Sequence, residues 1–251
     1  MKFLAAFCFL AQALTLLDGA FAGRTRQASF LPSDVAGLVS WYRASAISSS
    51  AGTEITSWSD SATTGWTLYG VAGSSPYVTN SSEINGQKWL NFDGASQTMR
   101  HTNGALAQPC TVFTVLKFHA LPPVSGSVLD GTNAAGRMLV GITSAGAFQI
   151  SGGTSLSSAS SLVPTGKWMI YEASFKASPN AAIITNGVSV QTGDAGSQAA
   201  AGLFVGQRQA GGRLFNGGLA EILIYTNDVS AGDRTSIRDY FYSKYGAAST
   251  W

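Results

Sequence analysis

Charged side chains are scarce in this chain of 251 residues. Asp, Glu, Lys and Arg make up 11% of it, against about 25% in an average soluble domain. The formal net charge of +2 argues against a nucleic-acid partner. The polar surface must therefore consist largely of uncharged side chains, and low charge weakens repulsion between copies. These properties suit a protein that lies against uncharged glycan or packs into an assembly.

Cysteine and histidine are also rare, with two of each in the chain. Cys8 lies in an N-terminal apolar segment, so its removal would leave Cys110 alone and exclude an intramolecular disulfide. We expect Cys110 to be buried like a small apolar residue; the alternative is a thiol available to a second chain. One cysteine and two separated histidines do not form a zinc ligand set, and no G-x-S-x-G nucleophile motif occurs.

Long apolar runs are absent except near the start of the chain. Lys2 precedes a mostly apolar segment, Phe3–Leu17, and Ala20-Phe21-Ala22 has the small-x-small pattern of a cleavage site. A membrane anchor is the alternative, but the run is shorter than the ~20 residues of a spanning helix. We therefore predict a signal peptide at 1–22, an N-terminal arm at 23–36, and a secreted, extracellular protein with no stable membrane insertion after cleavage.

No convincing helical periodicity occurs before Ser230. The chain instead contains short β-branched or aromatic runs separated by Gly, Ser and Asn, which is typical of a β-sandwich or barrel. Asn186-Gly187 predicts a tight hairpin, and the small polar stretches 151–161 and 192–202 predict loops. The predicted strands are 38–42, 55–59, 66–69, 88–92, 111–119, 137–142, 147–150, 167–175, 181–185, 188–191, 203–207 and 219–226.

The C-terminal stretch predicts one buried strand followed by an amphipathic helix. Ser230 can cap the helix, with Asp233 as the acidic half of a capping box, and Gly246 ends it. Apolar residues recur every four positions along one face. They are Ile237, Phe241 and Tyr245. We expect this face to seal one edge or mouth of the sandwich.

Several motifs together resemble one known superfamily. They are GLVSWYRA at 37–44, ITSWSD at 55–60, NGQKWLNFDG at 85–94, TVFTVLKF at 111–118, the Trp168 strand followed by Asn186-Gly187, and FNGGLAEILIY followed by the capped helix. In this order they resemble a concanavalin A-like lectin/glucanase domain of the laminin G-like type. The resemblance implies an all-β fold: a two-sheet antiparallel jelly-roll sandwich over 37–246 with one C-terminal capping helix, followed by a tail at 247–251. The fold itself does not imply a function, because such scaffolds include lectins, hydrolases, lyases and structural modules.

Catalytic residues of the glucanase type are not evident. Glucanases of this superfamily carry alternating carboxylates on one strand, because the acid and the nucleophile must share a face. No two carboxylates are two positions apart here, and Glu221 has only Leu219 and Leu223 as its same-face neighbours. We therefore predict that Glu221 is structural and that the protein is not an enzyme.

A lyase would need a base beside groups that neutralise a uronate carboxylate. Arg100 and His101 at a strand end, and Lys117 with His119 on one face of a strand, could supply such groups. Both pairs could equally be polar residues at the rim of the sandwich. They remain candidates for ligand binding.

Aromatic residues could stack on sugar rings. Trp58, Trp66 and Tyr69 are the better candidates for an exposed platform, whereas Trp89 and Trp168 sit beside apolar neighbours and are expected in the core.

Calcium is a possible cofactor, because laminin G-like domains often bind it through loop oxygens. Asp60, Asp93 and Asp130 lie at predicted strand ends and could each donate to an ion. In such turns Asp more often accepts hydrogen bonds from its own backbone.

Two classes of function follow. The first is a secreted, non-catalytic, lectin-like module that binds a glycan or polysaccharide. The alternative is a structural or adhesive subunit of an extracellular or virion assembly, built from copies of itself, in which residues 23–30 add to a neighbour's sheet edge. A weaker alternative is a jelly-roll polysaccharide lyase or hydrolase. Asn80-Ser81-Ser82 is an N-glycosylation pattern.

Overall fold

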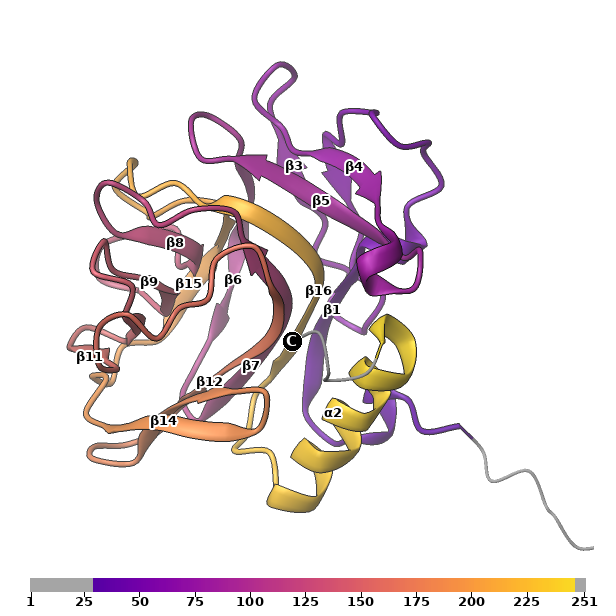
Figure 1. Cartoon of the computed structure of the whole chain (residues 1–251). Helices are drawn as coiled ribbons and strands as arrows, with labels where there is room; N and C mark the ends of the chain where they lie inside the picture. The colour runs from indigo at the N-terminus through magenta and orange to yellow at the C-terminus, as the bar shows by residue number, and fades with distance from the viewer. Residues whose placement is uncertain (1–28, 247–251) are drawn as a thin grey trace, which may run out of the picture. The chain divides into compact units, whose positions relative to one another are not determined.

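Two antiparallel sheets of eight strands each and one C-terminal α-helix make up the fold (Figure 1). The computed structural model describes residues 29–246. The predicted signal peptide, most of the predicted arm and the tail lie outside the described residues. The predicted all-β sandwich with one C-terminal helix is confirmed. No helix within residues 29–246 is long and apolar enough to span a bilayer.

Sheet A is built around its longest strand, β16. One edge of β16 pairs with β7 along nearly its whole length, and the other edge pairs first with β5 and then with β1. The strand order is β14-β13-β12-β7-β16-β5-β4. The strands are β1 (Leu38–Arg43), β4 (Tyr77–Asn80), β5 (Lys88–Asp93), β7 (Cys110–Phe118), β12 (Trp168–Phe175), β13 (Ala181–Thr185), β14 (Val188–Gly193) and β16 (Asn216–Tyr225).

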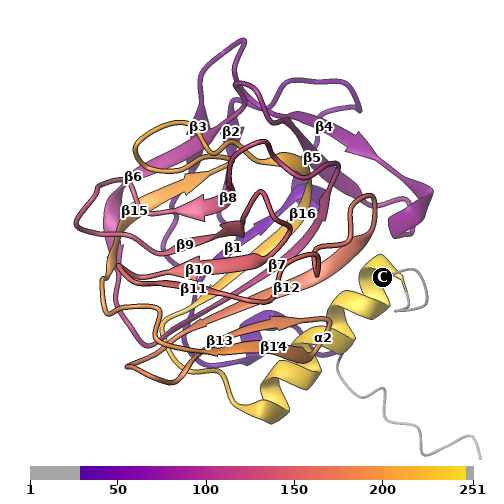
Figure 2. The ribbon, with the colours of Figure 1, turned by 60° about the vertical axis from the view of Figure 1, so that its left-hand side comes forward.

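Sheet B has the order β11-β10-β9-β8-β15-β6-β3-β2 and lies in front of β7, β12 and β16 in Figure 2. Its strands are β2 (Ser57–Trp58), β3 (Leu68–Gly70), β6 (Met99–Leu106), β8 (Gly126–Asp130), β9 (Leu139–Ile142), β10 (Phe148–Ser151), β11 (Ser155–Ser157) and β15 (Ala200–Val205). Three short 3-10 turns precede or follow strands: η1 (Pro32–Asp34), η2 (Ala44–Ala46) and η3 (Ser82–Ile84).

Four strands have no counterpart in the sequence-based prediction: β4, β6, β8 and β11. Strand β6 is mostly exposed, so its polar residues show no apolar alternation. Strand β11 lies within the stretch 151–161, which was predicted to be a loop, and has only three residues. Strand β8 is buried along its whole length, but its five residues GSVLD include only two large apolar side chains, so they too show no clear strand pattern.

The sandwich core consists of the side chains that the two sheets turn toward each other. On β7, Val112, Leu116 and Phe118 belong to this core, while Phe113 and Val115 lie on the outer face yet are also fully or almost fully buried. The outer face of sheet A must therefore be covered, which explains why β7 is a continuous apolar run instead of an alternating one.

The helix α2 (Ala231–Tyr245) provides part of that cover. Ser230 caps it, because its hydroxyl accepts the backbone N–H of Asp233 at 3.1 Å. The predicted apolar face is the buried one and the helix ends before Gly246, so the prediction for this element is confirmed.

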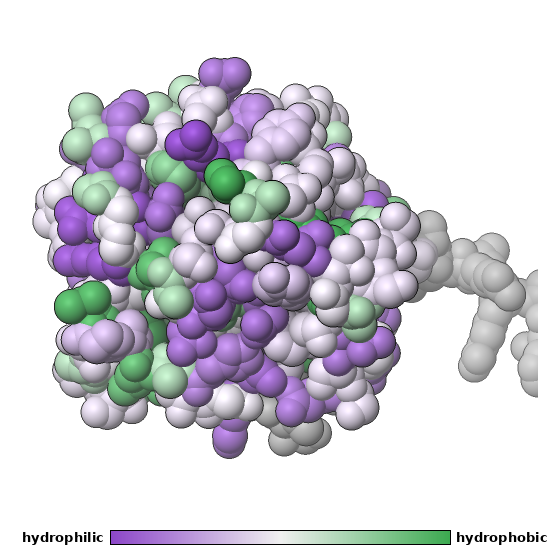
Figure 3. Space-filling model, turned by 90° about the horizontal axis from the view of Figure 1, so that it is seen from above, coloured by the Kyte–Doolittle hydropathy of each residue, from purple (hydrophilic) through white to green (hydrophobic). Residues whose placement is uncertain are grey.

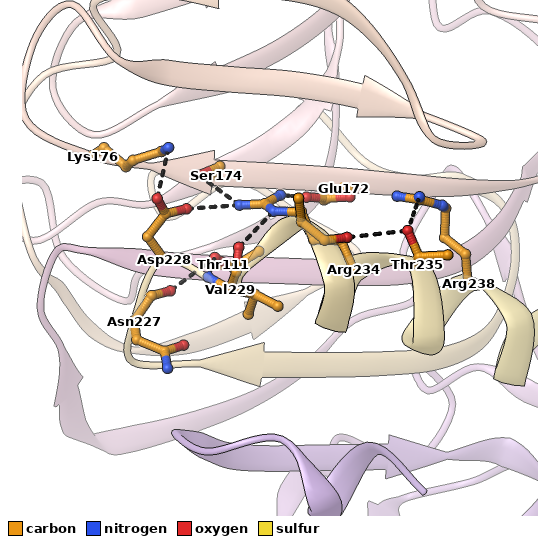
Figure 4. A network of polar contacts seen from close by, with 11 residues as sticks. Thr111, Glu172, Ser174, Lys176, Asn227, Asp228, Val229, Arg234, Thr235 and Arg238 are labelled. Carbon is orange, nitrogen blue, oxygen red and sulfur yellow. Dashed lines mark hydrogen bonds and ion pairs between the residues drawn. The ribbon is translucent and has the colours of Figure 1, made fainter. Parts of the chain in front are cut away.

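The helix α2 was expected to seal an edge or mouth of the sandwich, but it lies elsewhere. Arg234 in its first turn forms ion pairs with Glu172 on β12 and with Asp228, at 2.8 Å in the second case (Figure 4). Lys244 in its last turn pairs with Glu221 on β16 at 2.6 Å. The helix thus crosses the outer face of sheet A from β12 to β16. Outward residues on these strands are buried, and only a covering element can keep them from water.

Two local predictions are also confirmed. Asn186 and Gly187 have φ angles of 48° and 84°, the left-handed values that a two-residue hairpin requires. Cys110 is free and fully buried, and burial raises the pKa of its thiol to about 12.

Candidate functional site

A pocket of about 380 Å³ opens where the chain leaving β1 passes β2, the last strand of sheet B. This volume lies within the range of small-ligand sites, about 300–1,000 Å³. The lining is unusually rich in hydroxyl groups, with one cation and one carboxylate added. The polar lining residues are Arg43, Ser48, Ser49, Glu54, Thr56, Ser57, Ser59 and Ser61. We refer to it as the hydroxyl pocket.

The two charged residues of the hydroxyl pocket are held in place by the fold. The guanidinium of Arg43 lies 4.2 Å from the ring centre of Trp41, and its Nε donates to the Ser61 hydroxyl at 3.3 Å. Oε1 of Glu54 accepts two backbone N–H groups of the 73–75 loop, at 2.7 and 3.0 Å. Since Oε2 of Glu54 and the terminal nitrogens of Arg43 make no hydrogen bond within residues 29–246, both groups can still bind a ligand.

A row of outward side chains on sheet B begins at the hydroxyl pocket. Ser57 on β2 lies opposite Tyr69 on β3, and Tyr69 lies opposite Arg100 on β6. Arg100 is opposite Phe204 on β15, which in turn is opposite Asp130 on β8. Tyr69 is 59% exposed, so its ring is open to a ligand directly beside the pocket. We call these five residues the outer row; Phe204 and Asp130, at its far end, are 7% and 0% exposed and are therefore covered by other residues.

The other predicted aromatic residues do not form an open platform. Trp58 is only 1% exposed and belongs to the core, so its prediction as an exposed stacking residue is wrong: on β2 it alternates with Ser57 and points inward. Trp66 is partly buried and stacks on His101, with ring centres 5.2 Å apart. Arg100 and His101 point to opposite faces of sheet B, so they cannot act on one substrate group.

Lys117 and His119 lie on one face, the outer face of sheet A, as expected for that pair. The Lys117 ammonium sits 5.5 and 5.3 Å from the ring centres of Trp89 and Trp168 and pairs with Glu83 at 2.8 Å. Burial, and then the Lys117 charge, lower the pKa of His119. The two tryptophans are 8% and 3% exposed, so neither ring is open for stacking.

The three aspartates considered for calcium do not converge. Asp60 accepts the backbone N–H groups of Trp41 and Ala62 and the Thr64 hydroxyl. Asp93 accepts hydrogen bonds from backbone N–H groups of its own turn. Asp130 accepts hydrogen bonds from the Arg137 guanidinium and from two backbone N–H groups. Among residues 29–246, no three His, Cys, Asp or Glu side chains gather as a metal site would require.

Glu221 is a satisfied structural carboxylate, as predicted. One of its oxygens accepts the indole N–H of Trp41 and the Tyr240 hydroxyl, the latter at 3.0 Å. The other accepts the Lys244 ammonium at 2.6 Å and the Tyr245 hydroxyl at 2.5 Å. With no exposed surface, this carboxylate is closed to any substrate.

The residues that sequence reasoning missed come from separate segments. The hydroxyl pocket draws serines from two stretches, 48–49 and 57–61, whose only signal is a local abundance of hydroxyls. Arg137 and the two arginines of the loop 206–215 gather beside Asp130. Only strand pairing reveals that they share a surface.

The exposed surface is mixed in character. Figure 3 shows the end of the sandwich that is uppermost in Figure 1, where hydrophilic residues surround small, separate apolar groups. Among the described residues, the exposed large apolar side chains are spread over many elements. They are Leu31, Tyr69, Val71, Tyr77, Leu121, Val124, Leu162 and Val188. Scattered exposure of this kind is normal for a soluble surface.

No protein-family model and no curated protein sequence matches this chain. Solved structures do match it in fold. Domain 4 of AbnA, an extracellular GH43 arabinanase from Geobacillus stearothermophilus solved with arabinotriose, is 15% identical, with a TM-score of 0.58 over 81% of this chain and 99% of that one. Trypanosoma rangeli sialidase in complex with sialic acid is 12% identical, with a TM-score of 0.57 over 81% of this chain and 33% of that one.

A third match is the binding domain of Paraclostridial Mosquitocidal Protein 1, at 9% identity and a TM-score of 0.61, covering 85% of this chain and 53% of that one. This chain thus spans about a third of the sialidase and about half of the toxin domain. At these identities the likeness shows the fold alone. The chain is a β-sandwich similar to domains of these sialidase, arabinanase and toxin proteins.

Proposed function

We propose that this chain is a secreted, non-catalytic carbohydrate-binding module of the concanavalin A-like, laminin G-like type, and that the glycan binds in the hydroxyl pocket beside Tyr69. The observation that carries the proposal is the position of an exposed aromatic ring next to a pocket lined by hydroxyl groups.

The chemistry of a sugar matches this arrangement. Sugar hydroxyls both donate and accept hydrogen bonds, and the serine hydroxyls of the pocket do the same. Glu54 adds a free acceptor oxygen and Arg43 adds free donors. The apolar C–H face of a sugar ring packs on an aromatic face, which Tyr69 offers at the pocket's side.

The structural neighbours support the proposal at the level of the fold. Domain 4 of the arabinanase is described in complex with arabinotriose and the sialidase with sialic acid. The matched region is nearly all of the arabinanase domain but only a third of the sialidase, and a shared fold does not by itself transfer a ligand.

The experiment is glycan-array screening of the purified protein, followed by titration calorimetry with the best-retained oligosaccharide. Tyr69→Ala removes the stacking ring and should weaken binding about 10-fold, since an aromatic contact is worth about 1 kcal/mol beyond its area. Tyr69→Phe keeps the ring and should bind nearly as wild type does. Val188→Ala, at the far edge of sheet A, is the matched control for loss of an exposed apolar side chain. Equal binding by wild type and Tyr69→Ala would reject the site.

A second candidate function is an assembling subunit, and the free edge of β14 favours it. This strand is last in sheet A, and Val188 on it is 65% exposed. An unpaired strand edge can accept a strand from a neighbouring copy. Light scattering tests this: an assembling subunit elutes as a large species that shrinks when residues 23–30 are deleted, whereas a glycan-binding module stays monomeric.

A further inference from the structure

Arg100 lies in the middle of the outer row, directly opposite Tyr69, and three more arginines lie beside Asp130 at the end of the row away from the hydroxyl pocket. Arg100 and Asp130 flank Phe204 on three adjacent strands, so all three side chains share one face of sheet B. Arg137 donates to the Asp130 carboxylate through Nε at 3.1 Å and Nη2 at 2.8 Å. Asp130 is fully buried and the Arg137 side chain is 17% exposed, so the buried carboxylate holds this arginine in a fixed position at the surface.

The loop 206–215 brings the other two arginines to the same place. In Figure 1 this loop joins β15 to β16 beside β8. The backbone N–H of Gln209 donates to Asp130 at 3.2 Å, and the carbonyl of Arg213 accepts the N–H of Ser127 at 2.8 Å. The loop is therefore bonded to β8 at two points. We call Arg100, Arg137, Arg208 and Arg213 the arginine surface.

The arginine surface carries a net positive charge that no nearby acidic side chain neutralises within residues 29–246. Four arginines against one aspartate leave three formal positive charges, in a chain whose total is only +2. The side chains of Arg100, Arg208 and Arg213 form no hydrogen bond or ion pair within residues 29–246. Burial, followed by the charges of Arg208 and Arg137, lowers the pKa of Arg213, which places these guanidinium groups within electrostatic reach of one another.

The backbone at Arg213 adds a second, independent observation. Arg213 has a φ of 47°, a left-handed conformation that costs a residue with a side chain about 1 kcal/mol or more. Gly211 and Gly212 precede it with φ of 74° and 62°, so glycine is used freely in this loop. An arginine at the third left-handed position gains nothing for the turn. The loop therefore carries a charged side chain at a position that glycine would occupy with less strain.

We propose that the arginine surface binds the oxyanion groups, carboxylate or sulfate, of an acidic oligosaccharide whose other sugar units occupy the hydroxyl pocket. This inference rests on the proposed function. Guanidinium groups recognise such oxyanions through paired, charge-assisted hydrogen bonds. Arg100 lies one strand spacing from Tyr69, about 5 Å, and Asp130, which holds Arg137, lies three spacings away, about 14 Å, so a ligand that reaches from Tyr69 to Arg137 must be an oligosaccharide.

Three probes test the proposal by titration calorimetry: an oligogalacturonate, a sulfated oligosaccharide, and a neutral oligosaccharide with the backbone of the tighter-binding acidic one. The variants are Arg208→Gln and Arg213→Gly. The second removes the side chain while relieving the left-handed strain, so it should fold at least as well as wild type. Lys167→Gln removes an exposed positive charge near Trp168 on the other sheet and is the matched control.

We expect one acidic probe to bind more tightly than its neutral counterpart, each arginine variant to lose about 10-fold in affinity for it, and Lys167→Gln to lose none. If acidic and neutral probes bind alike and only Tyr69→Ala weakens them, the inference is wrong and the proposed function stands. If no glycan binds, both are wrong. If a single-stranded oligonucleotide binds as tightly as the acidic probe, the surface recognises polyanions in general, and the assignment to an acidic glycan is wrong.

Discussion

Replacing Glu221 by Gln should destabilise the protein severely, because this carboxylate fastens α2 to the sheet. It accepts hydrogen bonds from four side chains and has no exposed surface. An amide has a single acceptor oxygen, so some of these donors would lose their partner. Lys244, whose side chain is only 17% exposed, would keep an uncompensated charge. Removing one member of a buried ion pair costs about 3–5 kcal/mol, which is a large part of the total stability of a domain.

The assay is urea unfolding of wild type and variant, read as the change in midpoint at constant slope. Glu83→Gln is the matched control, since Glu83 also pairs with a lysine but its side chain is 54% exposed, and its loss should cost less than about 1 kcal/mol. The double variant Glu221→Leu with Lys244→Met should be less destabilised than the sum of the single changes. A cost for Glu221→Gln no larger than that for Glu83→Gln would refute the anchoring role.

Three further predictions concern stability. Ser230→Ala removes the helix cap and should cost about 1 kcal/mol in urea unfolding, whereas Ser236→Ala, within α2 and away from its cap, should cost far less. Gly218→Ala places a Cβ 2.7 and 2.9 Å from two buried tryptophan rings and should lower the unfolding free energy by about 1–3 kcal/mol; an unchanged urea midpoint would contradict that packing. Burial raises the pKa of Tyr171 and of Tyr245, and the charge of Glu221 raises that of Tyr245 further. Above pH ~10 the unfolded chain therefore loses these hydroxyl protons while the native chain keeps them. The urea midpoint should stay constant below pH ~10 and fall above it.

The sequence predicts best those elements whose signal is local. The cap at Ser230, the four-residue spacing through Tyr245 and the turn at Asn186-Gly187 each depend on a few neighbouring residues, and all three are confirmed. The covering of sheet A by α2 could not be predicted in the same way. It depends on Glu172 and Glu221, which are far apart in the chain and meet the helix only after the strands pair.

The candidate site is less predictable for the same reason. Tyr69 and Arg100 were selected separately, and only the pairing of β3 with β6 places them side by side. Trp58 is expected at the surface because its sequence neighbours, Ser57 and Ser59, are polar, and its inward direction follows only from the packing of β2 on the core. The loop arginines at 208 and 213 had no motif to mark them, since their shared surface arises from contacts of that loop with β8.

Amide hydrogen exchange, with and without a saturating concentration of the best-retained oligosaccharide, tests the central claim most directly. The account predicts slower exchange in residues 43–61 and 68–70, which form the hydroxyl pocket and its aromatic neighbour, and unchanged exchange in β14. Protection confined to residues 152–154 and 194–198, which line a different depression, would contradict the proposed site, as would no protection anywhere.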